Sequence, residues 1–165
     1  MKKMLILLFT IFSAVSFSEN VDIVIKNATV LTMNSKRTVI ENGVVAIKNN
    51  AIVEVGNEEL LSKYKGKKTI DAENDIVMPG FINTHTHVSM VAFRSLADDV
   101  PDRLSRYIFP LENKLVSRDL VYKGAVYGIL EMVSTGTTTF ADMYYFEDEV
   151  AKAAELIGCL LYTSD

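Results

Sequence analysis

The stretch VMPGFINTHTHVSM, residues 77–90, decides how the rest of the chain is interpreted. Its apolar part leads directly into His85 and His87, which are the only two histidines among 165 residues. Residues i and i+2 of a β-strand point to the same side, so we expect both imidazoles on one face of a strand end. Two neutral imidazoles placed in this way suit a divalent transition metal such as zinc. The alternative is that both histidines are structural residues.

The chain after residue 78 alternates between strand and helix patterns. The run MPGFINTH is typical of a strand that is buried on both faces. Further segments predict a helix, a strand, a second helix and a third strand, at residues 117–136, 137–145, 147–158 and 159–165. Such an alternation with short joins indicates βαβ units and a parallel sheet.

Two helical segments of this region carry more specific expectations. In residues 117–136, Ser117 is a good N-cap and Gly136 follows the helix end. Much of the apolar face of this helix is predicted to consist of Leu120, Ala125, Tyr127, Leu130 and Val133. Residues 102–115 also have helical spacing, but Pro110 is expected to end or kink that helix.

The part of the chain before residue 78 is predicted to be rich in β-structure. The segments VDIVIKNATVLTM and VIENGVVAIKNNAIVEVG contain short β-branched runs divided by Asn, Gly and Lys pairs, which indicates hairpins. EELLSKYKG is expected to form one or two helical turns. Two short strands are predicted on either side of the turn DAEND, residues 71–75.

The first 18 residues have the layout of a secretory signal peptide. Lys2 and Lys3 precede an apolar stretch from Met4 to Phe12, and small residues follow up to Ser18. The apolar stretch is shorter than the ~20 residues that a membrane-spanning helix needs. We therefore expect cleavage, export to the periplasm or the medium, and no stable membrane span afterwards.

Composition excludes several classes of function. The net charge of −4 comes without a basic block, which argues against a nucleic-acid partner. The single cysteine, Cys159, cannot build a disulfide framework or a cysteine-rich zinc site. The sequence lacks the H-E-x-x-H, G-x-G-x-x-G, P-loop and G-x-S-x-G motifs, and it also lacks the cytidine-deaminase signature.

The stretch around the histidines resembles the signature of the metal-dependent amidohydrolase superfamily, in which Pro-Gly, apolar residues and Asn or Asp precede His-x-His. The segments DIVIKNATVLTMN and VVAIKNNAIVEVG resemble the small N-terminal β-sandwich of that superfamily. The resemblance runs from about residue 21 to residue 158. It implies an α/β fold, in which residues 78–165 begin a truncated TIM-type (β/α)8 barrel and residues 19–77 form the N-terminal part of a β-sandwich.

A narrower resemblance concerns one branch of the superfamily. THTHVSMVAFRSLADD, FPLENKL and GTTTFADMYYFEDEVAKAAELIG are similar to the branch that holds 5-methylthioadenosine/S-adenosylhomocysteine deaminase and related chlorohydrolases. This implies that Glu112 contacts the ribose of a nucleoside, because a carboxylate can accept hydrogen bonds from sugar hydroxyls. The alternative is a solvated glutamate at a helix end. Asp142 ends a predicted strand, and a structural role is expected for it.

The resemblance also implies the chemistry. His85 and His87 are expected to bind Zn²⁺, which activates water for hydrolytic deamination of an adenine nucleoside or another heterocyclic amine. Further metal ligands and the proton-transfer residues are expected on later strands, so no catalytic residue is assigned here. A complete barrel takes ~250 residues, whereas 78 follow His87. We therefore expect the 165 residues to be an inactive piece of a longer enzyme.

Several alternatives stay open from the sequence. The enzyme could instead be a chlorohydrolase, a guanine deaminase or a cyclic amidase, or the chain could be a non-catalytic module. The resemblance implies a cytoplasmic protein, whereas residues 1–18 predict export. A homo-oligomer is compatible with either location.

Overall fold

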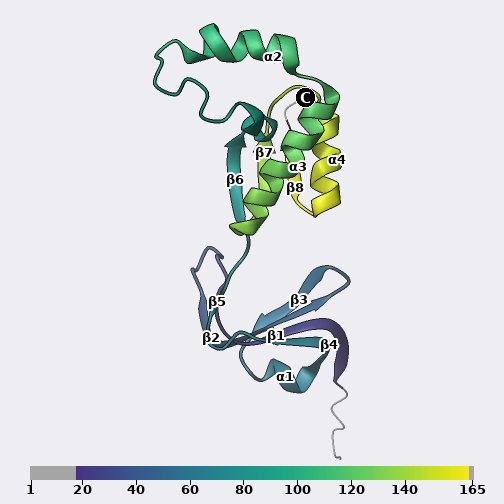
Figure 1. The fold of residues 1–165 in the computed structure, drawn as a ribbon. Coiled ribbons are helices and arrows are strands. Elements are labelled where there is room, and N and C mark those ends of the chain that lie inside the picture. The colour runs from purple at the N-terminus through teal and green to yellow at the C-terminus, as the bar shows by residue number, and fades with distance from the viewer. Residues whose placement is uncertain (1–17, 164–165) are drawn as a thin grey trace, which may run out of the picture. The chain divides into compact units, whose positions relative to one another are not determined.

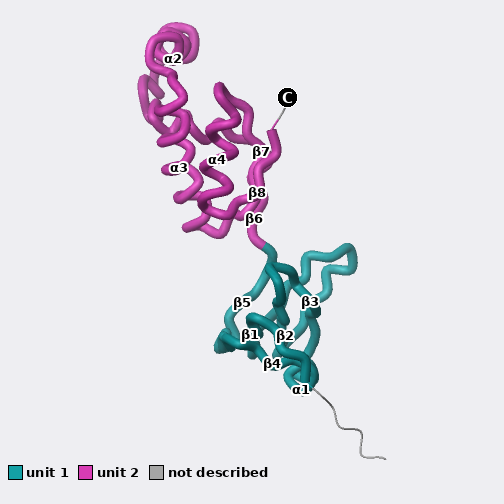
Figure 2. The backbone as a smooth tube through the Cα atoms, turned by 90° about the vertical axis from the view of Figure 1, so that its right-hand side faces the viewer, with its two compact units in different colours: residues 1–79 teal, residues 80–165 magenta. Residues whose placement is uncertain are grey.

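The structure is a computed structural model that describes residues 18–163. It divides into two compact units, residues 1–79 and 80–165, which are described separately below (Figure 2). The predicted signal peptide, residues 1–18, lies outside the described residues except for Ser18. Among residues 18–163, no helix is both long enough and apolar enough to cross a membrane.

The first unit is built on one mixed β-sheet (Figure 1). Its strands run in the order β3-β2-β1-β4, and β5 also pairs with β1. The antiparallel pairs β1–β2 and β2–β3 confirm the predicted hairpins, whereas β4 and β5 both pair with β1 in parallel. The elements are β1 (Glu19–Leu31), β2 (Val39–Lys48), β3 (Ala51–Gly56), α1 (Leu60–Lys63), β4 (Tyr64–Asp71) and β5 (Ile76–Val77).

Side chains of β2 show how this sheet is packed. Val44 and Ala46 belong to one buried apolar cluster, while Val45 between them belongs to another. Successive side chains of a strand point to opposite faces, so both faces of the sheet carry apolar residues. The turn after β2 uses Asn49 and Asn50 with φ of 52° and 63°. A two-residue hairpin turn with positive φ at both central residues has a backbone twist that matches the twist of the flanking strands.

The second unit alternates strands and helices. Its sheet has the order β6-β7-β8, and both strand pairs are parallel, as the βαβ pattern predicted. The strands are β6 (Phe81–Thr86), β7 (Thr137–Asp142) and β8 (Leu160–Thr163). The helices are the 3₁₀-helix η1 (Val88–Phe93), the π-helix η2 (Leu104–Ile108), α2 (Phe109–Leu115), α3 (Arg118–Ser134) and α4 (Glu147–Ile157).

Strand β6 corrects one expectation. It was predicted to be buried on both faces, but Phe81 and Ile82 are 56% and 67% exposed. Within the described residues β6 pairs only with β7, so it is an edge strand. Pro110 does not end the helical segment, because it lies in the first turn of α2, directly after the π-helix η2. The helix type changes from π to α just before the proline, which lacks the N–H that an interior helical position would donate.

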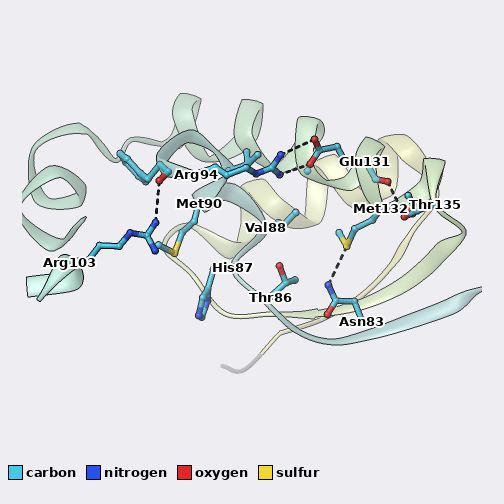
Figure 3. A pocket seen from close by; sticks show the side chains of 13 residues that line it. Asn83, Thr86, His87, Val88, Met90, Arg94, Arg103, Glu131, Met132 and Thr135 are labelled. Atoms are coloured by element: carbon cyan, nitrogen blue, oxygen red, sulfur yellow. Dashed lines mark hydrogen bonds and ion pairs between the residues drawn. The ribbon is translucent and has the colours of Figure 1, made fainter. Parts of the chain in front are cut away.

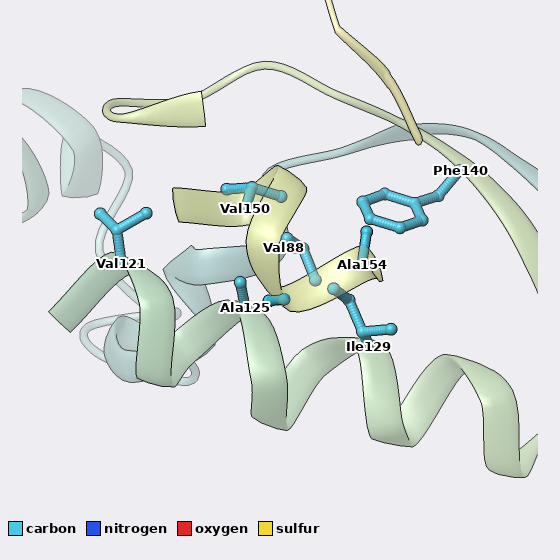
Figure 4. Packing of buried hydrophobic residues seen from close by; sticks show 8 residues of the cluster. Val88, Val121, Ala125, Ile129, Phe140, Val150 and Ala154 are labelled. Carbon is cyan, nitrogen blue, oxygen red and sulfur yellow. The ribbon is translucent and has the colours of Figure 1, made fainter. Parts of the chain in front are cut away.

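Helix α3 buries a different face from the one predicted. Tyr127, Leu130 and Val133 are exposed, and of the predicted face only Ala125 is fully buried. The buried side is instead made of Val121, Gly124, Ala125, Gly128 and Ile129. Figure 4 shows Val121, Ala125 and Ile129 facing Val150 and Ala154 of α4, with Phe140 of β7 beside them. Small residues select this side because they allow neighbouring segments to approach closely.

Helix α3 lies very close to η1, the helix that follows His87. A Cβ atom added to Gly124 would lie 2.7 Å from the Ser89 carbonyl oxygen. One added to Gly128 would lie 2.7 Å from Cγ2 and 2.9 Å from the carbonyl oxygen of Val88. The Ser89 hydroxyl also donates a hydrogen bond of 2.9 Å to the Val121 carbonyl. The segment after the histidines is thus packed directly on the backbone of α3.

The close contact between Gly124 and Ser89 predicts whether an alanine substitution at Gly124 raises or lowers stability. Gly→Ala inside a helix normally gains stability, by up to about 1 kcal/mol. Gly124→Ala should instead lower the free energy of unfolding by about 1–3 kcal/mol, because the methyl group overpacks the contact with Ser89. Urea unfolding of the full-length protein measures the change, with the exposed Lys123→Ala as control. A Gly124→Ala variant more stable than the wild type would contradict the close contact.

Candidate metal centre

The two histidines lie together at the carboxyl end of β6. Their ring centroids are 5.1 Å apart and the ring planes meet at 77°. His85 lies in the strand and His87 is the residue just before η1. The backbone amide of His85 donates to Asn83 Oδ1 at 3.2 Å, so the asparagine of the motif fixes the strand end. The i, i+2 spacing therefore brings the imidazoles together, as expected.

A hydrogen bond determines which nitrogen of His87 is free. Its Nδ1 contacts the carbonyl oxygen of Met143, which directly follows β7. A carbonyl oxygen can only accept, so Nδ1 carries the proton and the lone pair lies on Nε2. A metal-binding histidine commonly uses its other ring nitrogen in this way, which fixes both the tautomer and the ring.

Asp142, the last residue of β7, fixes the turn after the histidines. Its Oδ1 accepts a hydrogen bond of 2.7 Å from the backbone amide of Val88. The side chain is only 4% exposed, and its Oδ2 has no hydrogen-bond partner among residues 18–163. Burial raises the pKa of Asp142, while the bond from Val88 opposes that rise. The structural role expected for Asp142 is therefore visible as a bond between the ends of two neighbouring strands.

Glu147 is a second buried carboxyl group near this turn, and sequence reasoning missed it because only its place at the start of a helix marks it. Both carboxyl oxygens are buried, without a hydrogen-bond partner in the described part of the chain. Burial, and then the negative charge of Asp142, raise the pKa of Glu147 to about 7. A proton on Glu147 relieves the repulsion between the two carboxyl groups.

These groups fit part of a metal site. His85 and His87 supply two adjacent imidazoles, and the free Oδ2 of Asp142 lies on the neighbouring strand end. Among residues 18–163, however, no three His, Cys, Asp or Glu side chains are gathered closely enough to hold a metal ion. The described residues therefore bring two imidazoles together, which is fewer than the three protein ligands that a catalytic zinc usually takes.

Glu112 lies in a pocket that also contains His87. The pocket has a volume of about 540 Å³ and is lined by His87, Met90, Leu104, Phe109, Glu112, Met143, Tyr144 and Tyr145. Glu112 is 6% exposed, which rules out the solvated glutamate considered as the alternative. Its Oε1 accepts a hydrogen bond of 2.8 Å from the Tyr144 hydroxyl. Sequence reasoning missed Tyr144, because its partner is 32 residues away.

In a second pocket beside His87, the charged side chains are bound to other groups of the protein and are not free for a polar ligand. Arg94 makes two contacts with Glu131, at 3.0 and 2.5 Å, and Asn83 Nδ2 points to the sulfur of Met132 (Figure 3). Arg103 donates to the carbonyl oxygen of Leu96 at 2.6 Å. The charged groups of this pocket of about 460 Å³ therefore have partners inside the protein, and they attach the segment after His87 to α3.

Removal of the Asp142 carboxylate tests the turn. Asp142→Ala leaves the Val88 amide buried without an acceptor, which should cost about 1–3 kcal/mol of unfolding free energy. Asp142→Asn keeps a carbonyl acceptor and should cost less. Hydrogen exchange of the Val88 amide should become faster in the alanine variant and stay slow in the asparagine variant. Equal exchange rates in both would show that this bond does not hold the turn.

The raised pKa of Glu147 predicts that the stability of the protein depends on pH. Its pKa is raised from 4.5 to about 7 in the folded protein. Between these values the folded state binds a proton that the unfolded state releases, so its contribution to the unfolding free energy falls as pH rises through this window. Glu147→Gln should remove that contribution in urea unfolding between pH 4.5 and 8, whereas the exposed Glu155→Gln should not. An unchanged pH profile in Glu147→Gln would contradict the raised pKa.

Comparison with known proteins places the chain in a family. Residues 76–164 match the model of the amidohydrolase family. The chain is 44% identical over 148 residues to 5-methylthioadenosine/S-adenosylhomocysteine deaminase 1 of Syntrophus aciditrophicus, covering 87% of this chain and 33% of that protein. It is 45% identical over 139 residues to 5'-deoxyadenosine deaminase of Methanosarcina barkeri, covering 83% and 31%. The chain thus spans about a third of the length of the curated relatives it matches.

Solved structures agree with the sequence relatives. An adenosine deaminase from Xanthomonas campestris, crystallised with bound zinc, superposes with a TM-score of 0.83 at 30% identity, over 87% of this chain and 34% of that one. A triazine hydrolase from Arthrobacter aurescens superposes with a TM-score of 0.70 at 25% identity, over 86% and 34%. The strand-helix order, the histidine pair at the end of β6 and these matches lead to one conclusion: the chain belongs to the amidohydrolase family.

Proposed function

We propose that this chain is the N-terminal part of a metal-dependent hydrolase that deaminates adenine nucleosides of the 5-methylthioadenosine or S-adenosylhomocysteine type. The names of the relatives support a deaminase, and the zinc in the adenosine deaminase structure supports Zn²⁺ as the metal. On this proposal residues 80–165 begin a TIM-type barrel, and residues 19–79 form part of the small β-sandwich. The three parallel strands of the second unit support the first of these assignments.

The observation that carries the proposal is the shared pocket of His87 and Glu112. The pocket is lined by the imidazole of His87, whose ring lies 5.1 Å from that of His85, and by the buried carboxylate of Glu112. A nucleoside needs both features, because the reacting base must reach the metal while the ribose hydroxyls need an acceptor. The methionine and aromatic side chains that also line the pocket suit a flat, apolar ring system.

The residues of this chain would have separate roles in this reaction. When bound, the metal supplies Lewis-acid activation of the water that replaces the amine, which leaves as ammonia. His85 and His87 would hold the metal, and the Met143 carbonyl keeps Nε2 of His87 directed to it. Glu112 would bind the ribose and hold the base in place. Positioning of this kind accelerates a reaction because the reacting groups no longer need to find each other.

Glu112 also separates the nucleoside proposal from the main alternative. A triazine has no hydroxyl pair to satisfy a buried carboxylate. A chlorohydrolase with this pocket would therefore leave Glu112 without a donor other than Tyr144, and unpaired buried charge is costly. This burial favours a hydroxyl-bearing substrate.

Replacement of either histidine tests the metal role. In the full-length protein, His85→Ala and His87→Ala should each lower zinc content and should reduce kcat/KM about a hundredfold or more, since a ligand is lost. Zinc is measured by elemental analysis, and ammonia release is measured with methylthioadenosine, adenosylhomocysteine and a chlorinated triazine. The exposed Lys68→Ala serves as control. Full zinc content and turnover in either histidine variant would refute the assignment.

A further inference from the structure

The unassigned side chain closest to the proposed ribose site is Tyr144. It follows β7 by two residues and lines the same pocket as Glu112 and His87. Its hydroxyl donates to Glu112 Oε1 at 2.8 Å, and its ring centroid lies 6.4 Å from that of His87. Tyr144 therefore contacts Glu112 directly and lies near His87.

The hydrogen bond leaves Glu112 with one free oxygen. Within residues 18–163, Oε2 of Glu112 makes no hydrogen bond, while Oε1 is occupied by Tyr144. The carboxylate is 6% exposed, so its orientation depends on the few groups that contact it. Burial and the hydrogen bond to Glu112 both raise the pKa of Tyr144. The phenol consequently remains protonated, and thus a donor, at neutral pH.

The segment that carries Tyr144 is fixed at both ends. Before it, Met143 contacts His87 through its carbonyl oxygen, and its amide donates to the Thr86 carbonyl at 3.3 Å. After it, Phe146 has a left-handed φ of 54°, and the guanidinium of Arg118 lies 5.1 Å from its ring centroid. A bulky residue in this region costs of order 1–3 kcal/mol and persists only where its surroundings enforce it. The direction of Tyr144 is thus set by the fold.

We propose that Tyr144 is a positioning residue, which holds the Glu112 carboxylate so that Oε2 faces the ribose hydroxyls of the substrate. The proposal rests on the proposed function, because it assigns Tyr144 to the ribose subsite of that enzyme. The same short segment orients His87 through Met143 and Glu112 through Tyr144. It thereby fixes the position of Glu112 relative to His87.

The test separates ribose binding from chemistry. In the full-length holoenzyme, Tyr144→Phe should raise KM for methylthioadenosine about tenfold, as expected for loss of a hydrogen bond to a charged group, while kcat changes less than about twofold. The inhibition constant of adenine, which lacks the ribose, should stay unchanged. Tyr122→Phe removes a hydroxyl from a partly buried tyrosine of the same unit and serves as the matched control. It should leave all three constants at wild-type values.

A double-mutant cycle completes the kinetic test. Glu112→Gln should also raise KM for the nucleoside, and the double variant should lose much less than the product of the two single effects, because both act through one contact. Multiplying effects, an unchanged KM in Tyr144→Phe, or an equal loss for adenine would each overturn the proposal.

A structural readout keeps the inference independent of turnover. Crystal structures of the ligand-free wild type and of Tyr144→Phe should differ in the orientation of the Glu112 carboxylate. If the wild type deaminates no adenine nucleoside, the proposed function fails, and this comparison alone decides about Tyr144. A Glu112 carboxylate that keeps its orientation in Tyr144→Phe would refute the positioning role.

Discussion

The hydrogen bond between the Val88 amide and the Asp142 carboxylate joins the parts of the second unit that matter most. It connects the turn after β6 to the end of β7, two segments that are 54 residues apart in sequence. On one side of it lie the imidazoles of His85 and His87, and on the other lies η1, packed against Gly124 and Gly128 of α3. Strand ends, helix packing and the histidine pair therefore share one anchor.

This anchor is maintained against an electrostatic cost. Asp142 and Glu147 are buried close to each other, and burial raises the pKa of both. A fold that needed only stability would gain from apolar residues of similar volume at these positions. Carboxyl groups here instead supply a strong acceptor for the Val88 amide and a negative environment beside the histidines. Perturbed groups of this kind cluster at functional sites, which agrees with the proposed metal centre.

Local patterns in the sequence were sufficient for a large part of the fold. The alternation of strand and helix, the hairpins before residue 57 and the pairing of the imidazoles all depend on spacing within a few residues. The buried face of α3 could not be predicted, because apolar residues surround this helix and the small residues Gly124 and Gly128 decide which side packs. The parallel pairing of β4 with β1 depends on contacts far apart in the chain.

Only some of the site residues could likewise be predicted from the sequence. His85, His87 and Glu112 stand in recognisable motifs, whereas the partners that orient them, Met143 and Tyr144, are revealed only by contacts across the fold. Asp142 could be placed at a strand end, but its acceptor role requires the position of Val88 to be known. A motif thus indicates which groups act, and the tertiary structure indicates what holds them.

The number of residues in the π-helix η2 affects the pocket that contains Glu112. It occupies Leu104–Ile108 and runs directly into α2, which carries Glu112. A π-turn accommodates one residue more than an α-helical turn, and each residue of a helix advances the side-chain direction by about 100°. The direction of the Glu112 side chain therefore depends on the number of residues in η2. The identities of the exposed Ser105 and Arg106 matter little for that direction. An insertion or deletion in η2 would therefore turn Glu112 away from the pocket, whereas a substitution of Ser105 or Arg106 would leave its direction unchanged.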